Sequence, residues 1–143
     1  MSRFYVPILV THVLVAVLGI GLIAAVAIVA ATARRAGRGA TEAAAALAPL
    51  LRYSAFSLAA MLVTGILLDV AARSAFGHSW WFRGSGMLLI VTGALHGLAR
   101  RTVRRGLVAG GSGEMALRRV ERIAYGMCVL IAAITVLMEA KPF

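Results

Sequence analysis

Residues 4–33 form an unbroken run of thirty residues without a single Asp, Glu, Lys or Arg. A helix of that length measures about 45 Å, whereas the hydrocarbon core of a bilayer is about 30 Å thick. The run is therefore long enough to cross a membrane and to project from it. We accordingly interpret the whole chain by the rules for membrane proteins, in which buried charges are costly and a polar side chain at membrane depth is informative.

The composition predicts an integral membrane protein with a single domain, residues 1–143. Apolar residue types make up 62% of the chain and charged types 14%, compared with about 25% charged residues in soluble domains. The first apolar run is longer than the roughly 7–15 residues of a secretory signal, so we expect it to remain in the mature protein. The net charge of +10 comes almost entirely from arginine. Because the arginines lie beside apolar runs, we expect them to face the lipid bilayer surface, and we expect no nucleic-acid partner.

Three further apolar runs follow, at 53–72, 84–99 and 123–138, and only the first of them contains a charged residue, Asp69. Flanking aromatic and arginine side chains can extend each run to a membrane-spanning length. The predicted fold is therefore all-α, a bundle of four transmembrane helices. We expect the helices at about 4–33, 44–73, 80–101 and 118–139, with Thr41 as the N-cap of the second.

The basic residues predict the orientation of the bundle. Eleven arginines belong to one side of the membrane: Arg34, Arg35, Arg38, Arg52, Arg100, Arg101, Arg104, Arg105, Arg118, Arg119 and Arg122. The other side carries four basic residues: Arg3, Arg73, Arg83 and Lys141. By the positive-inside rule, the first and third loops are cytoplasmic and both termini face outward. The sequence thus predicts a multi-pass protein of the cell inner (plasma) membrane.

Polar residues are predicted to gather near the outer face. His12 shares a helix stripe with Gly19, seven residues later, so we expect it to point into the bundle. Asp69, His78 and Glu139 lie near the outer ends of their segments. Imidazole and carboxylate groups can hold a divalent metal, which makes His12, Asp69 and Glu139 the predicted metal ligands. In the alternative interpretation, His12 bonds to a neighbouring helix and the other three pair with interfacial basic residues.

A second histidine, His96, lies at a different depth. It precedes Arg100 by four residues and therefore lies about 6 Å inside the cytoplasmic boundary. Its predicted distance from His12 along the membrane normal is roughly 14 Å, whereas the two axial nitrogens of one heme are about 4 Å apart. The two histidines therefore cannot bind the same heme. A heme bound by His12 needs another ligand in the outer half, such as Met87, because His/Met ligation is chemically sound.

Other features predict packing rather than chemistry. Gly86, Gly93 and Gly97 form a stripe of small residues, for which we expect close packing inside the bundle rather than dimerisation. Cys128 is the single cysteine, and its place in an apolar run predicts a packing residue. The glycine-rich segment 109–114 lacks the lysine of a phosphate-binding loop and is predicted to be a flexible connector.

Three segments together resemble one family: LVTHVLVAVLGIGL in the first helix, LLIVTGALHGLARR in the third, and ITVLMEAKPF at the end. The chain is similar to small membrane proteins of the HemJ type, which are protoporphyrinogen oxidases of heme biosynthesis, and to the related copper-resistance protein D group. The first resemblance implies an oxidoreductase with heme b, in which His12 is the ligand. Arg83 is a candidate contact for a propionate because of its charge. The second resemblance implies copper transport by residues near the outer face, His12, Asp69, Met138 and Glu139.

The sequence leaves three functions open. The first is a heme- or metal-associated redox protein resembling HemJ, and the second is a copper-resistance-like metal transport protein. The third is a non-catalytic bundle that acts as a subunit or assembly partner in a membrane complex or a homo-oligomer. The sequence assigns no catalytic residue.

Overall fold

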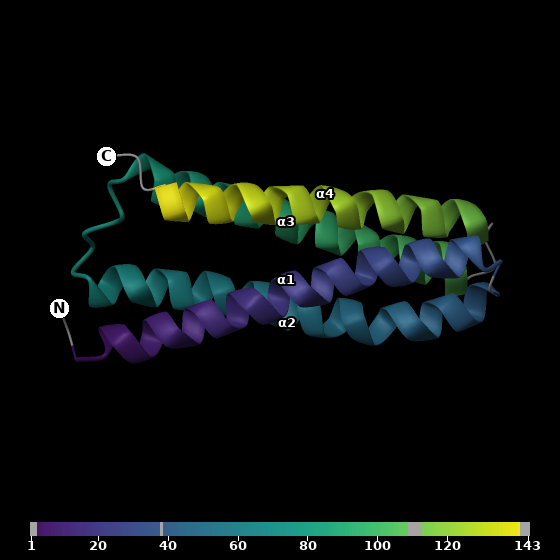
Figure 1. Ribbon diagram of the computed structural model, residues 1–143, viewed down its shortest axis with the longest axis horizontal. Coiled ribbons are helices and arrows are strands. Elements are labelled where there is room, and N and C mark those ends of the chain that lie inside the picture. The colour runs from purple at the N-terminus through teal and green to yellow at the C-terminus, as the bar shows by residue number, and fades with distance from the viewer. Residues whose placement is uncertain (1–2, 38, 109–112, 141–143) are drawn as a thin grey trace.

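The computed structural model describes residues 3–37, 39–108 and 113–140, which form an elongated helical bundle (Figure 1). Its four long helices are α1 (Tyr5–Arg35), α2 (Ala40–Ala71), α3 (Trp80–Thr102) and α4 (Gly113–Ala140). A π-helical turn, η1 (Val103–Val108), continues α3. No strand occurs within these ranges, and the predicted all-α fold class is confirmed.

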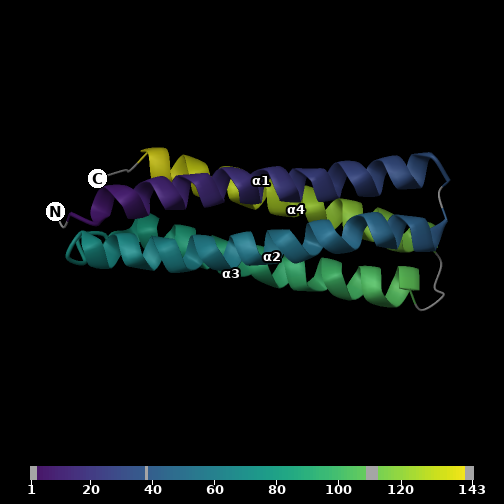
Figure 2. The ribbon, with the colours of Figure 1, turned by 90° about the horizontal axis from the view of Figure 1, so that it is seen from below.

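The four helices form a ring in which α1 contacts α2 and α4, and α3 contacts α4 and α2. The α2–α3 contact is less extensive than the α1–α2, α3–α4 and α1–α4 contacts. α1 begins and α4 ends at the same end of the bundle, beside the loop that joins α2 to α3 (Figures 1 and 2). We call this the terminal end. The opposite end, where α1 ends and η1 lies, is the arginine-rich end.

Three helices are long and apolar enough to cross a membrane: α1, residues Thr41–Ala71 of α2, and α4. The outer surface of α1 is strongly apolar. Between 50% and 64% of the side-chain surface is exposed at four of its positions, Val13, Leu14, Val17 and Leu18. Such a surface suits contact with lipid rather than with water. α3, the shortest of the four with 23 residues and the least apolar on average, is not among the three. The structure therefore supports three of the four predicted spans.

The buried core lies mainly in the arginine-rich half of the bundle. Several of its side chains are fully buried: Ile23, Val26, Leu47, Val120 and Met127. Cys128 packs against this core, as its apolar surroundings predicted. Toward the terminal end, the connected cluster reaches only Ile23 on α1, Leu58 on α2 and Ile131 on α4. Beyond that level, a cavity and polar contacts between helices replace continuous apolar packing.

Two helices begin before their predicted positions. α2 begins at Ala40 because its alanine-rich start is a strong helix former, and Glu42 in the first turn suits the helix dipole. The N-cap position precedes Thr41 and has no side-chain cap, so the prediction of Thr41 as N-cap is wrong. α4 begins at Gly113, within the predicted connector, of which residues 109–112 lie outside the described residues.

The glycine stripe on α3 does not bring helices close together. A Cβ atom added at Gly86, Gly93 or Gly97 would meet no side chain and no other segment within 4 Å. The prediction of close internal packing by these glycines is therefore wrong. Gly19 on α1 is different, because a Cβ there would lie 2.6 Å from Ser57 Oγ on α2. The close approach of helices occurs at Gly19, on the stripe that also carries His12.

Candidate functional site

Two hydroxyl side chains of α2 bond to the two histidines within the bundle. Thr64 Oγ1 lies 2.7 Å from His12 Nδ1 on α1. Ser54 Oγ lies 2.8 Å from His96 Nε2 on α3. Hydrogen bonds between helices stabilise membrane bundles, and these two join α2 to both of its neighbours. The prediction that His12 bonds to a neighbouring helix is therefore confirmed for its Nδ1 atom.

The hydroxyl of Thr64 determines the tautomer of His12. A hydroxyl group has one hydrogen, and Thr64 Oγ1 donates it to the backbone oxygen of Ala60 at 2.7 Å. Thr64 Oγ1 therefore accepts the second bond, in which His12 Nδ1 is the donor. The Nε2 atom of His12 keeps a free lone pair, and no described residue forms a hydrogen bond with it. Metal-binding histidines commonly have this arrangement, with one nitrogen oriented by a partner and the other available.

His12 lines a cavity of about 230 Å³ in the terminal half of the bundle, which we call the His12 cavity. All four helices contribute to its walls, and the α2–α3 loop contributes Gly77. Three glycines leave parts of the wall without side chains, Gly65, Gly77 and Gly86. The lining side chains with polar or sulfur atoms are those of His12, Met61, Arg83, Ser85 and Met138, and all others are apolar. The cavity thus combines an imidazole, a guanidinium and two methionine side chains with apolar walls.

Two of the predicted cofactor-binding residues, His12 and Arg83, line this same cavity. Arg83 of α3 is held by the α2–α3 loop, because its Nε donates a hydrogen bond to the backbone oxygen of Gly77 at 2.9 Å. The two residues come from α1 and α3, which are far apart in the sequence. The structure therefore brings together an imidazole and a guanidinium that the sequence analysis selected separately.

The third predicted cofactor-binding residue, Met87, does not line the cavity, and 66% of its surface is exposed. The helical period explains its position. Ser85 and Leu89, four residues apart, both line the cavity, and Met87 between them points to the opposite side of α3. Met138 of α4 and Met61 of α2 are the sulfur-containing residues of the cavity instead. Met61 was missed by the sequence analysis, because a methionine in an apolar run carries no signal of its own.

The predicted metal ligands do not gather around His12. Asp69 Oδ1 accepts a hydrogen bond from the backbone N–H of Phe76 at 2.9 Å, and this contact closes the α2–α3 loop. Glu139 and His78 are exposed at the terminal end. In the part of the chain that the structure describes, no group of three or more His, Cys, Asp and Glu side chains lies close enough to hold a metal. The set of His12, Asp69 and Glu139 is therefore not assembled as one site.

His96 lies at a separate level of the bundle. It is 4% exposed, and its partner Ser54 is fully buried. Ser54 and Thr64 are ten residues apart on α2, so the histidines bonded to them differ by about 15 Å along the helix axis. This distance agrees with the predicted separation, and it excludes a single heme bound by both His12 and His96.

No protein-family model, no curated protein and no solved structure matches this chain. The resemblance to HemJ proteins stays a prediction from short sequence motifs, the last of which includes residues 141–143, outside the described residues.

Proposed function

We propose that this chain is a multi-pass protein of the cell inner (plasma) membrane, in which all four helices cross the bilayer and both termini face outward. The composition of α3 alone does not show whether this helix crosses the bilayer. Its 23 residues measure about 35 Å, which exceeds the roughly 30 Å of the hydrocarbon core. In this proposal the arginine-rich end is cytoplasmic, as the positive-inside rule requires.

Single-cysteine labelling tests this orientation. Cys128, the only native cysteine, is replaced by serine, and a new cysteine is placed at one of three exposed positions, Ala36, Ala75 or Arg105. A membrane-impermeant maleimide should label Ala75→Cys in intact cells, and Ala36→Cys only after the membrane is opened. Arg105→Cys should behave like Ala36→Cys, since α3 crosses. Labelling of Arg105→Cys in intact cells would contradict the crossing of α3.

We further propose that the His12 cavity binds a redox cofactor with His12 as a ligand. The single observation that supports this is the hydrogen bond of Thr64 to His12 Nδ1, which leaves the Nε2 lone pair free beside a cavity. A histidine that only joins two helices needs no space around its second nitrogen. The wall glycines Gly65 and Gly86 maintain that space where larger residues would fill it.

Heme b is the first candidate, because it fits the donor groups of the cavity. His12 offers an imidazole nitrogen and Met138 a thioether, which are a known pair of axial ligand types. Arg83 offers a guanidinium that can pair with a propionate carboxylate. When bound, heme supplies one-electron redox chemistry. The cavity of about 230 Å³ is smaller than the roughly 300–1,000 Å³ of most small-molecule sites, so it encloses only part of a porphyrin.

Copper(I) is the second candidate, and the small volume of the cavity favours it. Met61 and Met138 bring thioethers to the lining that contains His12, and soft sulfur donors select Cu(I). In this alternative the carboxylates of Asp69 and Glu139 are not ligands. The positive charge of Arg83 opposes a bound cation, whereas it attracts the propionates of heme. For that reason heme is the first proposal and copper the second.

Absorption spectra of the detergent-purified protein, produced with an adequate heme supply, test the heme proposal. The oxidised and dithionite-reduced wild type should show a Soret band that His12→Ala abolishes. His78→Ala is the matched control, because His78 is exposed in the α2–α3 loop and should leave the band unchanged. Met138→Leu should shift the band through the loss of a thioether ligand. A colourless wild-type protein contradicts the proposal.

Copper content measured after loading with Cu(I) under reducing conditions tests the second candidate. Bound copper should fall in both His12→Ala and Met138→Leu, and it should be retained in Asp69→Asn and Glu139→Gln. A protein that binds neither heme nor copper, and that co-purifies with a constant partner, would instead support the third function, a non-catalytic membrane subunit.

A further inference from the structure

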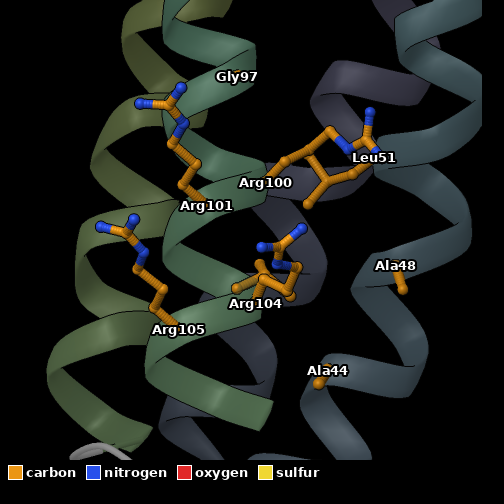
Figure 3. A pocket seen from close by; sticks show the side chains of 9 residues that line it. Ala44, Ala48, Leu51, Gly97, Arg100, Arg101, Arg104 and Arg105 are labelled. Carbon is orange, nitrogen blue, oxygen red and sulfur yellow. The ribbon is translucent and has the colours of Figure 1, made fainter. Parts of the chain in front are cut away.

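The arginine-rich end contains a recess of about 710 Å³ between α2 and the junction of α3 with η1, which we call the arginine pocket (Figure 3). Four of its nine lining residues are arginines from two successive turns: Arg100, Arg101, Arg104 and Arg105. None of the nine is acidic. The pocket is larger than the His12 cavity and lies in the opposite half of the bundle, so it is a separate site.

Small residues on both helices leave room for the pocket. Ala44 and Ala48 are four residues apart on α2 and therefore share a face. Gly97 of α3 lines the pocket farther from the arginine-rich end than Ala44 and Ala48, and a Cβ there would meet no side chain within 4 Å. This is also the pair of helices with the less extensive contact. Figure 3 shows Ala44 and Ala48 nearer the arginine-rich end than Leu51, and the Arg100 side chain extending to the level of Leu51.

The arginines are arranged in two rows. Figure 3 shows Arg100 and Arg104 extending from α3 and η1 on the side of α2, whereas Arg101 and Arg105 extend away from α2. Arg101 and Arg105 also line a second recess, of about 360 Å³, with Arg119 of α4. The π-helical turn begins within this run of arginines, and π turns occur frequently at functional sites.

Four of the five acidic residues form no ion pair with the pocket arginines. Glu114 forms an ion pair with Arg118 at 3.3 Å, and Glu121 forms one with Arg34 at 2.8 Å. No ion pair joins Asp69 or Glu139 to any of the four pocket arginines in the part of the chain that the structure describes. The positive-inside rule requires arginines on this side of the membrane, but it does not require four of them to line one recess. An anion that enters the pocket would relieve their mutual repulsion.

We infer that the arginine pocket binds the phosphate of an anionic phospholipid, with the acyl chains extending past Leu51 and Gly97 toward the middle of the bilayer. A guanidinium binds phosphate oxygens in a bidentate manner. Basic pockets between membrane helices on the cytoplasmic side suit lipid headgroups of this kind. The inference rests on the proposed membrane crossing of α2 and α3, and it is independent of any cofactor in the His12 cavity.

Thermal unfolding of the delipidated, detergent-solubilised protein tests this inference. Phosphatidylglycerol or cardiolipin should raise Tm in a saturable manner, whereas phosphatidylcholine at equal concentration should not. The double variant Arg100→Gln/Arg104→Gln should weaken the apparent affinity by at least about tenfold, since each basic group near the headgroup contributes to lipid attraction. The matched control, Arg52→Gln/Arg122→Gln, removes the same charge from exposed positions outside the pocket and should change the affinity by less than about threefold.

Three results would overturn the inference. Equal stabilisation by phosphatidylcholine would show that the lipid phosphate is not recognised. Equal loss in the control variant would show general charge attraction rather than a site. Stabilisation by pyrophosphate equal to that by the lipids would identify a soluble anion as the ligand. Should the double arginine variant fail to fold, Ala48→Phe keeps the arginines, fills the recess from the α2 side and should still abolish the lipid-induced rise in Tm.

Discussion

The Nδ1 atom of His12 donates a hydrogen bond of 2.7 Å to Thr64 Oγ1, and this bond joins α1 to α2 at the edge of the His12 cavity. The same bond has two consequences. It stabilises the helix pair, and it orients the imidazole so that Nε2 remains available. A stability measurement and a binding measurement on the same variants therefore separate its structural role from its functional one.

Thr64→Val removes the acceptor and leaves the rest of the helix contact in place. In a double-mutant cycle with His12→Ala, we expect a coupling energy of about 0.6 kcal/mol and at most about 1.7 kcal/mol, the range for such bonds in membrane proteins. Unfolding in mixed detergent micelles measures it. If His12 also binds a cofactor, Thr64→Val should weaken cofactor binding by about 10–100-fold, because an orienting partner has been lost. A coupling energy of zero would show that the bond contributes nothing to the helix pair.

Filling the His12 cavity should block binding without unfolding the protein. Gly86→Leu adds a side chain where a Cβ would meet no neighbouring side chain within 4 Å, and Gly86 lines the cavity. Gly93→Leu adds the same group on the same helix at an exposed position outside the lining. We expect heme or copper binding to fall only in Gly86→Leu, with similar Tm values for both variants. Equal binding by the Gly86→Leu and Gly93→Leu variants would show that the ligand does not bind in this cavity.

Ser54→Ala should destabilise the bundle through His96. His96 is buried, and its Nε2 would lose the Ser54 hydroxyl. Loss of this hydrogen bond should cost about 0.5–1.5 kcal/mol of the free energy of unfolding, because His96 keeps a hydrogen bond with the backbone of Leu51. Thr11→Val is the control, since Thr11 is exposed, bonds only within its own helix and should change stability by less than about 0.5 kcal/mol. The addition of His96→Leu should recover part of the loss, because no unpaired nitrogen then remains.

The sequence predicted helix faces better than it predicted contacts between helices. Gly19 marked the inward stripe of α1 correctly, because a period of 3.6 residues is readable from one helix alone. The pairing of His12 with Thr64 depends on how far α1 is shifted along α2, and no pattern within either helix encodes that shift. The selection of Met87 as a heme ligand rested on depth alone and was wrong for a related reason. Met87 and Met138 were both assigned a depth, but the rotation of α3 that exposes Met87 is a property of the packed bundle.

Depth in the membrane was likewise insufficient to predict the contacts of Asp69 and Glu139. Their positions along the chain predicted a place near the outer face for each, but they did not predict its direction around the helix. Asp69 uses its carboxylate to close the α2–α3 loop. This contact is local, because α2 has just ended and the chain turns at Arg73 and Ser74, which have positive φ. The arginine pocket was also beyond sequence analysis. Its arginines were visible as a topology signal, but Ala48 and Gly97, small residues that line the recess, come from different helices.

The close approach at Gly19 makes a steric prediction. A larger residue there would collide with Ser57 Oγ, which donates to the backbone oxygen of Val15 at 2.8 Å. Gly19→Leu should therefore destabilise the α1–α2 pair by about 1–3 kcal/mol, the usual cost of overpacking. Gly21→Leu is the matched control, because a Cβ at Gly21 meets nothing within 4 Å. The difference in Tm between the two variants measures the effect, and equal Tm values would show that Ser57 can move aside freely.

The ion pair of Arg34 with Glu121 should matter more than that of Arg118 with Glu114. Arg34 Nε donates to Glu121 Oε2 at 2.8 Å and thereby joins α1 to α4, with 26% and 12% of the two side chains exposed. The pair of Arg118 and Glu114 lies within α4 and is mostly exposed, so it should contribute little. We expect Glu121→Gln to lower Tm measurably and Glu114→Gln to leave it unchanged, with a smaller difference at high salt. The charge-swapped double variant Arg34→Glu/Glu121→Arg should regain part of the lost Tm. Equal Tm values for Glu121→Gln and Glu114→Gln at low salt would mean that the contact between α1 and α4 depends on apolar packing alone.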